Sequence, residues 1–282
     1  KFDNSYYMLS ADKRRAIIDL VKREVVPAIG CTEPIAVSLC VARAAEMLGQ
    51  LPEKINVRLS ANILKNAMGV GIPGTGMIGL PIAIALGAIV GRSEYGLEVL
   101  KDATPEAVEQ GRQYIDKRGI SIDLKEGIEE KLYIEVEVLG GDGSALAIIS
   151  GGHTNFVFLQ HNGQILLDAR VQQGGGDSSD DVELILRTVF DFAMESPIEE
   201  IEFIMEARRL NKSAAESAFV ADYGHSLGRT LRSERELSIM GDSIFSRIIS
   251  YTAAACDARM GGAQLPVMSN SGSGNQGITV TM

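Results

Sequence analysis

Apolar residues recur at helical spacing in both ends of the chain and alternate with polar residues in its centre. Ile17, Leu20, Val21 and Val25 share one face of a predicted helix over residues 11–28, which Ser10 can cap. Residue patterns of the same kind predict helices over residues 34–48, 80–90 and 104–119. They also predict a strand over residues 55–60, a short helix or loop over 61–68, and a glycine-rich loop over 69–79.

From residue 120 to residue 169 the apolar period is two, which is typical of strands with one buried face. Strands are predicted over residues 133–138, 145–150, 156–159 and 165–167. Asn162-Gly163 separates the last two of them and is a strong signal for a tight hairpin turn. The segment is therefore predicted to be an antiparallel β meander.

After residue 170 the pattern is helical again. Residues 172–181 are rich in Gly, Ser and Asp and predict a flexible connector, followed by helices over residues 182–194, 198–210, 213–223 and 243–260. The predicted fold class is α+β, an antiparallel β meander flanked by N-terminal and C-terminal helical segments. We divide the chain into residues 1–119, 120–170 and 182–282, which can also form one composite domain.

Composition limits the kinds of binding partner and the cellular compartment that we expect for this protein. A net charge of -10 argues against nucleic acid and anionic membranes. The most apolar run, residues 70–90, contains several glycines and prolines and fits a loop and a buried helix better than a membrane span. Three widely spaced cysteines predict no disulfide framework, and no signal peptide opens the sequence, so we expect a cytoplasmic protein.

The most informative motif is GCTEP at residues 30–34, which lies between two helical patterns. It places Cys31 at a helix N-terminus, where free N–H groups and the helix dipole favour a thiolate. Pro34 suits the first helical turn, and Thr32 or Glu33 can cap it. Such a cysteine can be a nucleophile, a redox centre or a metal ligand, or it can be a small buried residue at a tight turn.

GCTEP is followed by GGHTN at residues 151–155 and by SGSGNQG at residues 271–277. With these three motifs in this order, the chain resembles the L-cysteine desulfidases, a family also described as serine dehydratase alpha-like and related to the iron–sulfur L-serine dehydratases of bacteria. The resemblance extends over essentially the whole sequence. It implies a β-eliminating lyase that uses an oxygen-sensitive [4Fe-4S] cluster to split L-cysteine into pyruvate, ammonia and sulfide.

The resemblance also implies that Cys31 is a cluster ligand. A cluster of this type needs about three thiolates, and we interpret Cys40 and Cys256 as core residues because they lie in apolar or alanine-rich helices. The sequence ends on the apolar residues 278–282, and in the family the other ligands follow this point, so we expect a chain truncated at its C-terminus. Without those further ligands, the chain is expected to hold no intact cluster and to be inactive.

Further candidate residues surround these motifs. Lys65 and His153 are candidates for proton transfer, His153 because glycines beside it leave room for a ligand. SGSGNQG resembles an anion-binding turn at a helix start. The glycine-rich loop lacks the Gly-Lys-Ser/Thr of a nucleotide-binding P-loop, but its backbone N–H groups can approach a carboxylate. Candidate substrate contacts are therefore Thr32, Glu33, Asn66, Gly74, Asn155, Ser271, Gly272, Ser273, Asn275 and Gln276.

Three other functions compete with this hypothesis. An L-serine dehydratase would use the same chemistry with a hydroxyl leaving group. A binding or regulatory relative would keep the amino-acid pocket without the cluster, and a structural scaffold would need neither. The expected partner is a small amino acid, and the protein can also be a homo-oligomer. If the site is shared, Cys31, His153 and residues 275–277 must lie within about 15 Å of one another.

Overall fold

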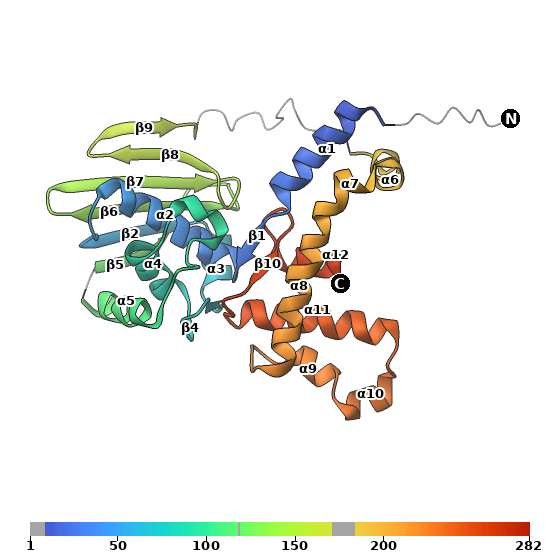
Figure 1. Cartoon of the computed structure of the whole chain (residues 1–282). Helices are drawn as coiled ribbons and strands as arrows, with labels where there is room; N and C mark the ends of the chain where they lie inside the picture. Colours follow the sequence, from blue (N-terminus) through green and yellow to red (C-terminus); the bar gives the residue numbers. More distant parts are fainter. Residues whose placement is uncertain (1–8, 118, 171–183) are drawn as a thin grey trace.

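The computed structural model describes residues 9–117, 119–170 and 184–282, and it forms two lobes (Figure 1). One lobe contains a six-stranded sheet with helices packed on it, and the other is helical. The fold class is α+β, as predicted. The connector predicted over residues 172–181 and the start of the helix predicted at residue 182 lie outside the described residues.

The sheet lobe is built from the chain up to residue 170, apart from α1 and β1. Its elements are α2 (Thr32–Leu48), β2 (Lys54–Leu59), α3 (Ala61–Ala67), β3 (Gly71–Ile72), β4 (Met77–Ile78), α4 (Leu80–Ile89), the 3-10 helix η1 (Ser93–Glu98), α5 (Pro105–Lys117), β5 (Gly119–Leu124), β6 (Tyr133–Gly140), β7 (Gly143–Ser150), β8 (Phe156–His161) and β9 (Gln164–Asp168).

The large sheet has the strand order β5-β2-β6-β7-β8-β9. Strands β6 to β9 form the predicted antiparallel meander, and Asn162 and Gly163 both adopt positive φ at its last turn. The sheet is nevertheless mixed rather than a pure meander, because β2 pairs with β6 and runs parallel to β5. Residues from the first two proposed parts of the chain therefore share one sheet.

Helices α2 and α4 cover the apolar face of this sheet. Helix α2 is apolar on nearly all sides, as expected of a helix enclosed by other elements. Leu39 and Val41 of α2 belong to the same core as Ile55 of β2, Ile82 of α4 and Ile134 of β6. This packing fixes the direction in which the N-terminus of α2 points.

The helical lobe contains α1 (Ala11–Glu24) and the elements after residue 184. These are α6 (Leu186–Glu195), α7 (Ile198–Ile201), the 3-10 helix η3 (Glu202–Ile204), α8 (Met205–Val220), α9 (Leu227–Leu231), α10 (Glu234–Met240), α11 (Ile244–Met260), β10 (Pro266–Met268) and α12 (Gly274–Thr281). Alanines of α8 and α11 form much of the lobe's core. Helix α8 runs through Ser213, so the predicted break between residues 210 and 213 is wrong.

A short antiparallel pair joins the two lobes. The first predicted helix is capped by Ser10 but ends at Glu24, four residues early, because Pro27 restrains Val26 to extended backbone. Pro27–Ile29 then form β1, which pairs with β10 over three residues (Figure 1). The pairing places the start of α2 beside the chain that leads into α12.

Asn211 of α8 anchors this junction. It is fully buried, accepts a hydrogen bond from Met268 N at 2.8 Å, and donates to Gly277 O at 3.2 Å and Thr281 Oγ1 at 2.7 Å. One side chain thereby joins α8, β10 and α12.

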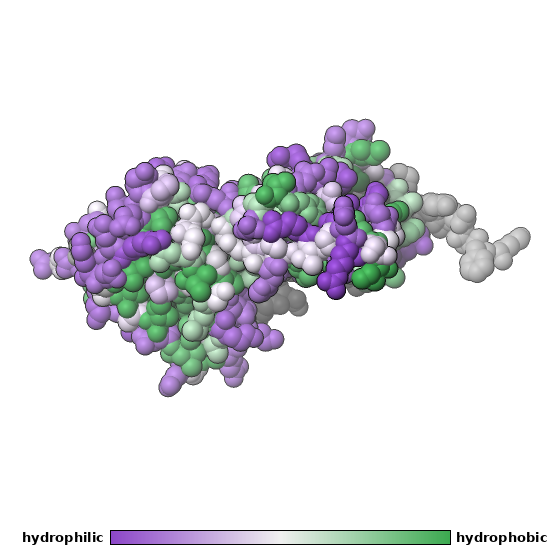
Figure 2. Space-filling model, turned by 90° about the horizontal axis from the view of Figure 1, so that it is seen from below, coloured by the Kyte–Doolittle hydropathy of each residue, from purple (hydrophilic) through white to green (hydrophobic). Residues whose placement is uncertain are grey.

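Several large apolar side chains of the helical lobe are exposed, among them Leu186 at 85% and Ile244 at 78%. Figure 2 shows patches of apolar surface on both lobes. Clustered exposed apolar side chains are typical of contact surfaces, but the predicted homo-oligomer stays a prediction. In the parts of the chain described here, no helix combines the length and apolar character needed to cross a membrane.

Replacing Asn211 with Ala should lower the free energy of unfolding by about 2–4 kcal/mol, because it leaves buried backbone groups of β10 and α12 without partners. Thr281→Val removes only one of these bonds and should cost about 1 kcal/mol. Urea unfolding measures both. Equal losses in the two variants would contradict the anchoring role.

Glu135 of β6 should make stability depend on acid. It is buried, with 6% exposed. Burial alone would raise its pKa, but hydrogen bonds from Lys125, Tyr133 and Arg58 lower the pKa by more than burial raises it, so the net pKa is depressed. The depressed pKa adds stability above the unfolded-state pKa of about 4.3, which is lost as pH falls through the folded-state value. Glu135→Gln should therefore cost about 2 kcal/mol at pH 7, and unfolding curves should show the difference shrinking below about pH 4. A constant difference would contradict this assignment.

Candidate functional site

Cys31 occupies the N-cap position of α2. Its backbone is extended, with φ −76° and ψ 133°, and Thr32 is the first helical residue. The prediction that α2 begins at Pro34 with Thr32 or Glu33 as the cap is therefore wrong by two residues. The thiol lies where the free N–H groups of a long buried helix point, as the motif predicted.

A carboxylate lies directly beside this thiol. The Cys31 thiol donates to Glu33 Oε2 at 2.9 Å, and the Thr32 hydroxyl donates to the same oxygen at 3.2 Å. Asn66 of α3 donates to Glu33 Oε1 at 3.2 Å. Burial by itself would raise the pKa of Glu33, but the bond from Cys31 and the other contacts lower it overall, so Glu33 is ionised near neutral pH.

The electrostatics of Cys31 differ from the prediction. The pKa of Cys31 is raised to about 12, mainly by burial and also by the Glu33 carboxylate, while Arg259 counteracts part of the rise. The predicted thiolate is wrong for these protein surroundings, because burial and a neighbouring negative charge outweigh the favourable effect of the helix N-terminus.

His153 lies in the turn between β7 and β8. Asn155 closes this turn by donating to Ser150 O at 2.9 Å. The imidazole packs against Gly272, which has φ +75° and where a Cβ atom would overlap Nδ1. Burial lowers the pKa of His153 although Glu33 opposes the shift, so the neutral imidazole is favoured at pH 7.

The downstream motif forms a tight turn into α12, which confirms the predicted helix start. Ser273 caps the helix by accepting a hydrogen bond from Gln276 N at 3.3 Å. Ser271 has φ +48°, a conformation that non-glycine residues adopt uncommonly. The turn places Ser271, Gly272 and Ser273 on the same cavity as His153 and Cys31.

Arg259, in the last turn of α11, is a residue of the site that the sequence reasoning missed. It is only 5% exposed and donates from a terminal nitrogen to Asn275 Oδ1 at 2.9 Å. The sequence signal was weak, because a basic residue at a helix C-terminus is ordinary. Its position shortly after the alanines at residues 253–255 and just before Gly261-Gly262 was the available hint.

These side chains surround a single cavity of about 310 Å³ at the junction of the lobes. The cavity confirms the expectation that Cys31, His153 and Asn275 share a cleft, and Gly277 does not line it. The lining residues are Cys31, Thr32, Glu33, Asn66, His153, Arg259, Met260, Ser271, Gly272, Ser273 and Asn275.

Four candidates do not line this cavity. Lys65 is exposed on α3, and Gln276 is exposed on α12. Gly74 lies in the β3–β4 turn, where its N–H donates to Gly262 O at 3.1 Å and helps to join the lobes. Asn155 acts on the site only through the turn that carries His153.

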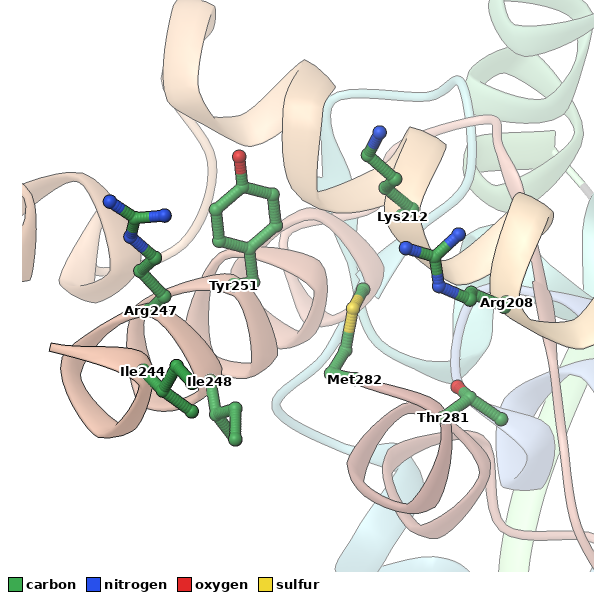
Figure 3. Close-up of a pocket in the computed structure, with 8 residues that line it drawn as sticks. All are labelled: Arg208, Lys212, Ile244, Arg247, Ile248, Tyr251, Thr281 and Met282. Carbon is green, nitrogen blue, oxygen red and sulfur yellow. The ribbon is translucent and has the colours of Figure 1, made fainter.

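A second cavity, of about 420 Å³, lies in the helical lobe between α8, α11 and α12 (Figure 3). It is lined by Arg208, Lys212, Ile244, Arg247, Ile248, Tyr251, Thr281 and Met282. None of these described residues carries a thiol, an imidazole or a carboxylate. The reactive groups of the three motifs belong to the first cavity.

The described residues do not complete an iron–sulfur site. Cys31 is the one thiol lining the cavity, whereas Cys40 is buried under the sheet, with its thiol donating to Ala147 O, and Cys256 packs against the helical core, as predicted for both. Over residues 9–117, 119–170 and 184–282, no group of three or more His, Cys, Asp or Glu side chains is placed to hold a metal. One thiol falls short of the roughly three that a cluster requires.

Fold and site together define an α+β protein with a small polar cavity where two lobes meet. The model of the family "Serine dehydratase alpha chain" matches residues 94–282, and the chain belongs to this family. A UPF0597 protein of Bacteroides fragilis is 62% identical over 274 residues, which is 97% of this chain and 64% of that protein.

Other relatives match this chain over a similar share of its length. A UPF0597 protein of Bacteroides thetaiotaomicron is 63% identical over 96% of this chain and 63% of its own length. One of Porphyromonas gingivalis is 48% identical over 97% of this chain and 65% of its own length. The chain thus spans somewhat less than two thirds of these curated relatives. No solved structure matches the chain.

In protein treated with a chelator, Cys31 should react slowly with iodoacetamide. A pKa near 12 reduces the thiolate fraction at pH 8 roughly 10³-fold relative to a free thiol, and burial slows access further. Glu33→Gln removes the neighbouring negative charge and should accelerate the reaction at least several-fold, measured by mass spectrometry of the peptide. Glu53→Gln, in the loop between α2 and β2, is the control. Equal rates in the two variants would show that Glu33 does not set the reactivity of Cys31.

Proposed function

We propose that this protein is a β-eliminating lyase for a small α-amino acid, with L-cysteine as substrate and pyruvate, ammonia and sulfide as products. The observation that carries the proposal is the convergence of Cys31, Glu33, His153 and the α12 turn on one cavity, although they come from distant parts of the sequence. Membership in the serine dehydratase alpha chain family supports the reaction class.

The cavity offers complementary groups for an amino acid. Glu33 is an ionised acceptor for the substrate ammonium, and Asn66 fixes its orientation. The turn at Ser271–Ser273 and the first N–H groups of α12 supply donors for the carboxylate. Thr32 holds Glu33 from the other side.

His153 is the proposed base. Because its pKa is lowered, the neutral imidazole is available to accept the Cα proton. The electron pair left on Cα forms the Cα–Cβ double bond while the Cβ–S bond breaks, and the sulfur leaves as sulfide with a proton returned by the imidazolium. The aminoacrylate product tautomerises to an imine, and one water hydrolyses it to pyruvate and ammonia. Lys65, which is exposed outside the cavity, is the weaker candidate for this role.

The resemblance implies a [4Fe-4S] cluster, and we retain it as the proposed cofactor with Cys31 as one ligand. Such a cluster supplies Lewis-acid chemistry when bound. Its other ligands are expected outside the sequence given. A cytoplasmic location and a homo-oligomeric state also remain proposals.

L-Serine is the second candidate substrate, favoured by the name of the matching family. The chemistry is the same with water as the leaving group. A relative that binds the amino acid without turnover is the remaining alternative, and the same experiment distinguishes the three.

The test uses intact protein purified without oxygen and assayed for pyruvate and sulfide. We expect turnover of L-cysteine exceeding that of L-serine. His153→Asn should reduce kcat by about 10²–10⁴-fold, and Cys31→Ser should remove both iron and turnover, because a hydroxyl replaces a thiolate ligand.

Matched controls are His161→Asn, in the β8–β9 hairpin, and Cys256→Ser, in α11, which should both keep iron and activity. Faster turnover of L-serine would select the dehydratase. Binding of either amino acid without product would select the non-catalytic relative. Full activity and iron content in Cys31→Ser would refute the proposed role of this thiol.

A further inference from the structure

Arg259 is a buried cation with an incomplete set of partners. Its guanidinium carries five N–H donors, yet its side-chain hydrogen bonds go to Asn275 Oδ1 at 2.9 Å and Met260 Sδ at 3.4 Å, both from one terminal nitrogen and both to neutral acceptors. The Nε atom is buried without a hydrogen-bond partner, and none of the ion pairs among the described residues includes Arg259. Arginine is seldom buried without an opposite charge.

The surroundings increase this electrostatic cost. The guanidinium lies against Gly274, the first residue of α12, where a Cβ atom would overlap Arg259 Nε. The N-terminus of a helix carries partial positive charge. A cation placed there is unfavourable unless an anion lies close to both. Two independent sources of positive potential therefore point to an anion in the same part of the cavity.

The same cavity also carries a negative charge. Glu33 lines it and accepts hydrogen bonds from Thr32 and Asn66. A small ligand with an anionic end and a cationic end can pair with both charges, whereas an inorganic anion would leave the Glu33 carboxylate with its neutral donors and no cationic partner. A volume of about 310 Å³ is at the lower end of ligand pockets and suits a small molecule.

We propose that Arg259 binds the α-carboxylate of the substrate and so restricts the site to α-amino acids. Which amino acid binds rests on the proposed function. The recognition of a carboxylate by Arg259 does not depend on that function. Asn275 positions the guanidinium, and Gly274 allows it to lie flat against the start of α12. The ligand supplies the counter-charge that the described residues do not provide.

The first experiment compares L-cysteine with cysteamine, which has the same thiol and ammonium but no carboxylate. Dissociation constants are measured by calorimetry on intact anaerobic protein, for wild type, Arg259→Gln and Arg259→Lys. In wild type L-cysteine should bind at least 100-fold more tightly than cysteamine. Arg259→Gln should reduce this preference to less than about fivefold, and Arg259→Lys should restore part of it. Arg208→Gln, in the second cavity, is the control and should keep the full preference.

A second variant covers the case in which Arg259→Gln does not fold. Asn275→Asp places a carboxylate next to the guanidinium, at the 2.9 Å contact that the amide makes now. It should raise the thermal midpoint, because the buried cation gains a partner, and should weaken L-cysteine binding at least tenfold. If Arg259 only joins α11 to α12, the thermal midpoint should rise and binding should stay unchanged.

The results of these experiments distinguish a failure of the inference about Arg259 from a failure of the proposed function. If neither L-cysteine nor L-serine is turned over but Arg259→Gln abolishes the preference for the carboxylate, the function fails and the inference stands. If turnover is found but Arg259→Gln and Asn275→Asp keep the wild-type preference, the inference is wrong and the function stands. Binding of inorganic phosphate with the affinity of L-cysteine would also overturn it.

Discussion

The three-residue pairing of β1 with β10 is the constraint on which the rest of the site depends. It joins Pro27–Ile29 to Pro266–Met268, just before the Cys31 motif and just before the turn into α12. Ser269 continues the contact by donating from its hydroxyl to Val26 O at 2.7 Å. Because a ladder this short has few hydrogen bonds of its own, Asn211 and the packing of α2 on the sheet must hold its two sides in place.

The cavity combines groups that a stable core would avoid. A carboxylate, a thiol, an imidazole and a guanidinium are partly or fully buried within one small volume. Their mutual hydrogen bonds satisfy Glu33 well and Arg259 poorly. Such imbalance reduces stability, and it is typical of sites whose last partner is a ligand. The α+β frame tolerates it because the apolar core under the sheet is separate from the cavity.

Much of the fold could be predicted from local pattern. The alternation after residue 120, the Asn162-Gly163 turn and the capped start of α1 each follow from nearby residues. The parallel pairing of β2 with β5 could not be predicted, since it depends on which distant strand completes the sheet. The early end of α1 is a local effect of Pro27 that apolar periodicity concealed.

The site was predictable to the extent that its motifs are unusual in composition. Cys31, His153 and Ser271–Ser273 have glycines in or beside their motifs, which marked them in the sequence and which the structure uses for close approach. Arg259 is a common residue in a common helical position, so its importance depends on burial and on a missing partner. The pKa of Cys31 depends on the balance between burial and the helix dipole, and burial is known only from the folded chain.

The β1–β10 pairing also has a consequence for biosynthesis. The partners Val26 and Ser269 are separated by 243 residues. At a translation rate of roughly 5–20 residues per second, β10 leaves the ribosome about 12–50 s after β1. The sheet lobe can fold in that interval while the backbone of β1 is still unpaired, so the nascent chain carries the Cys31 thiol without the helical lobe that later encloses it. The site can form only after residues 266–275 have left the ribosome, because they provide β10 and part of the cavity lining.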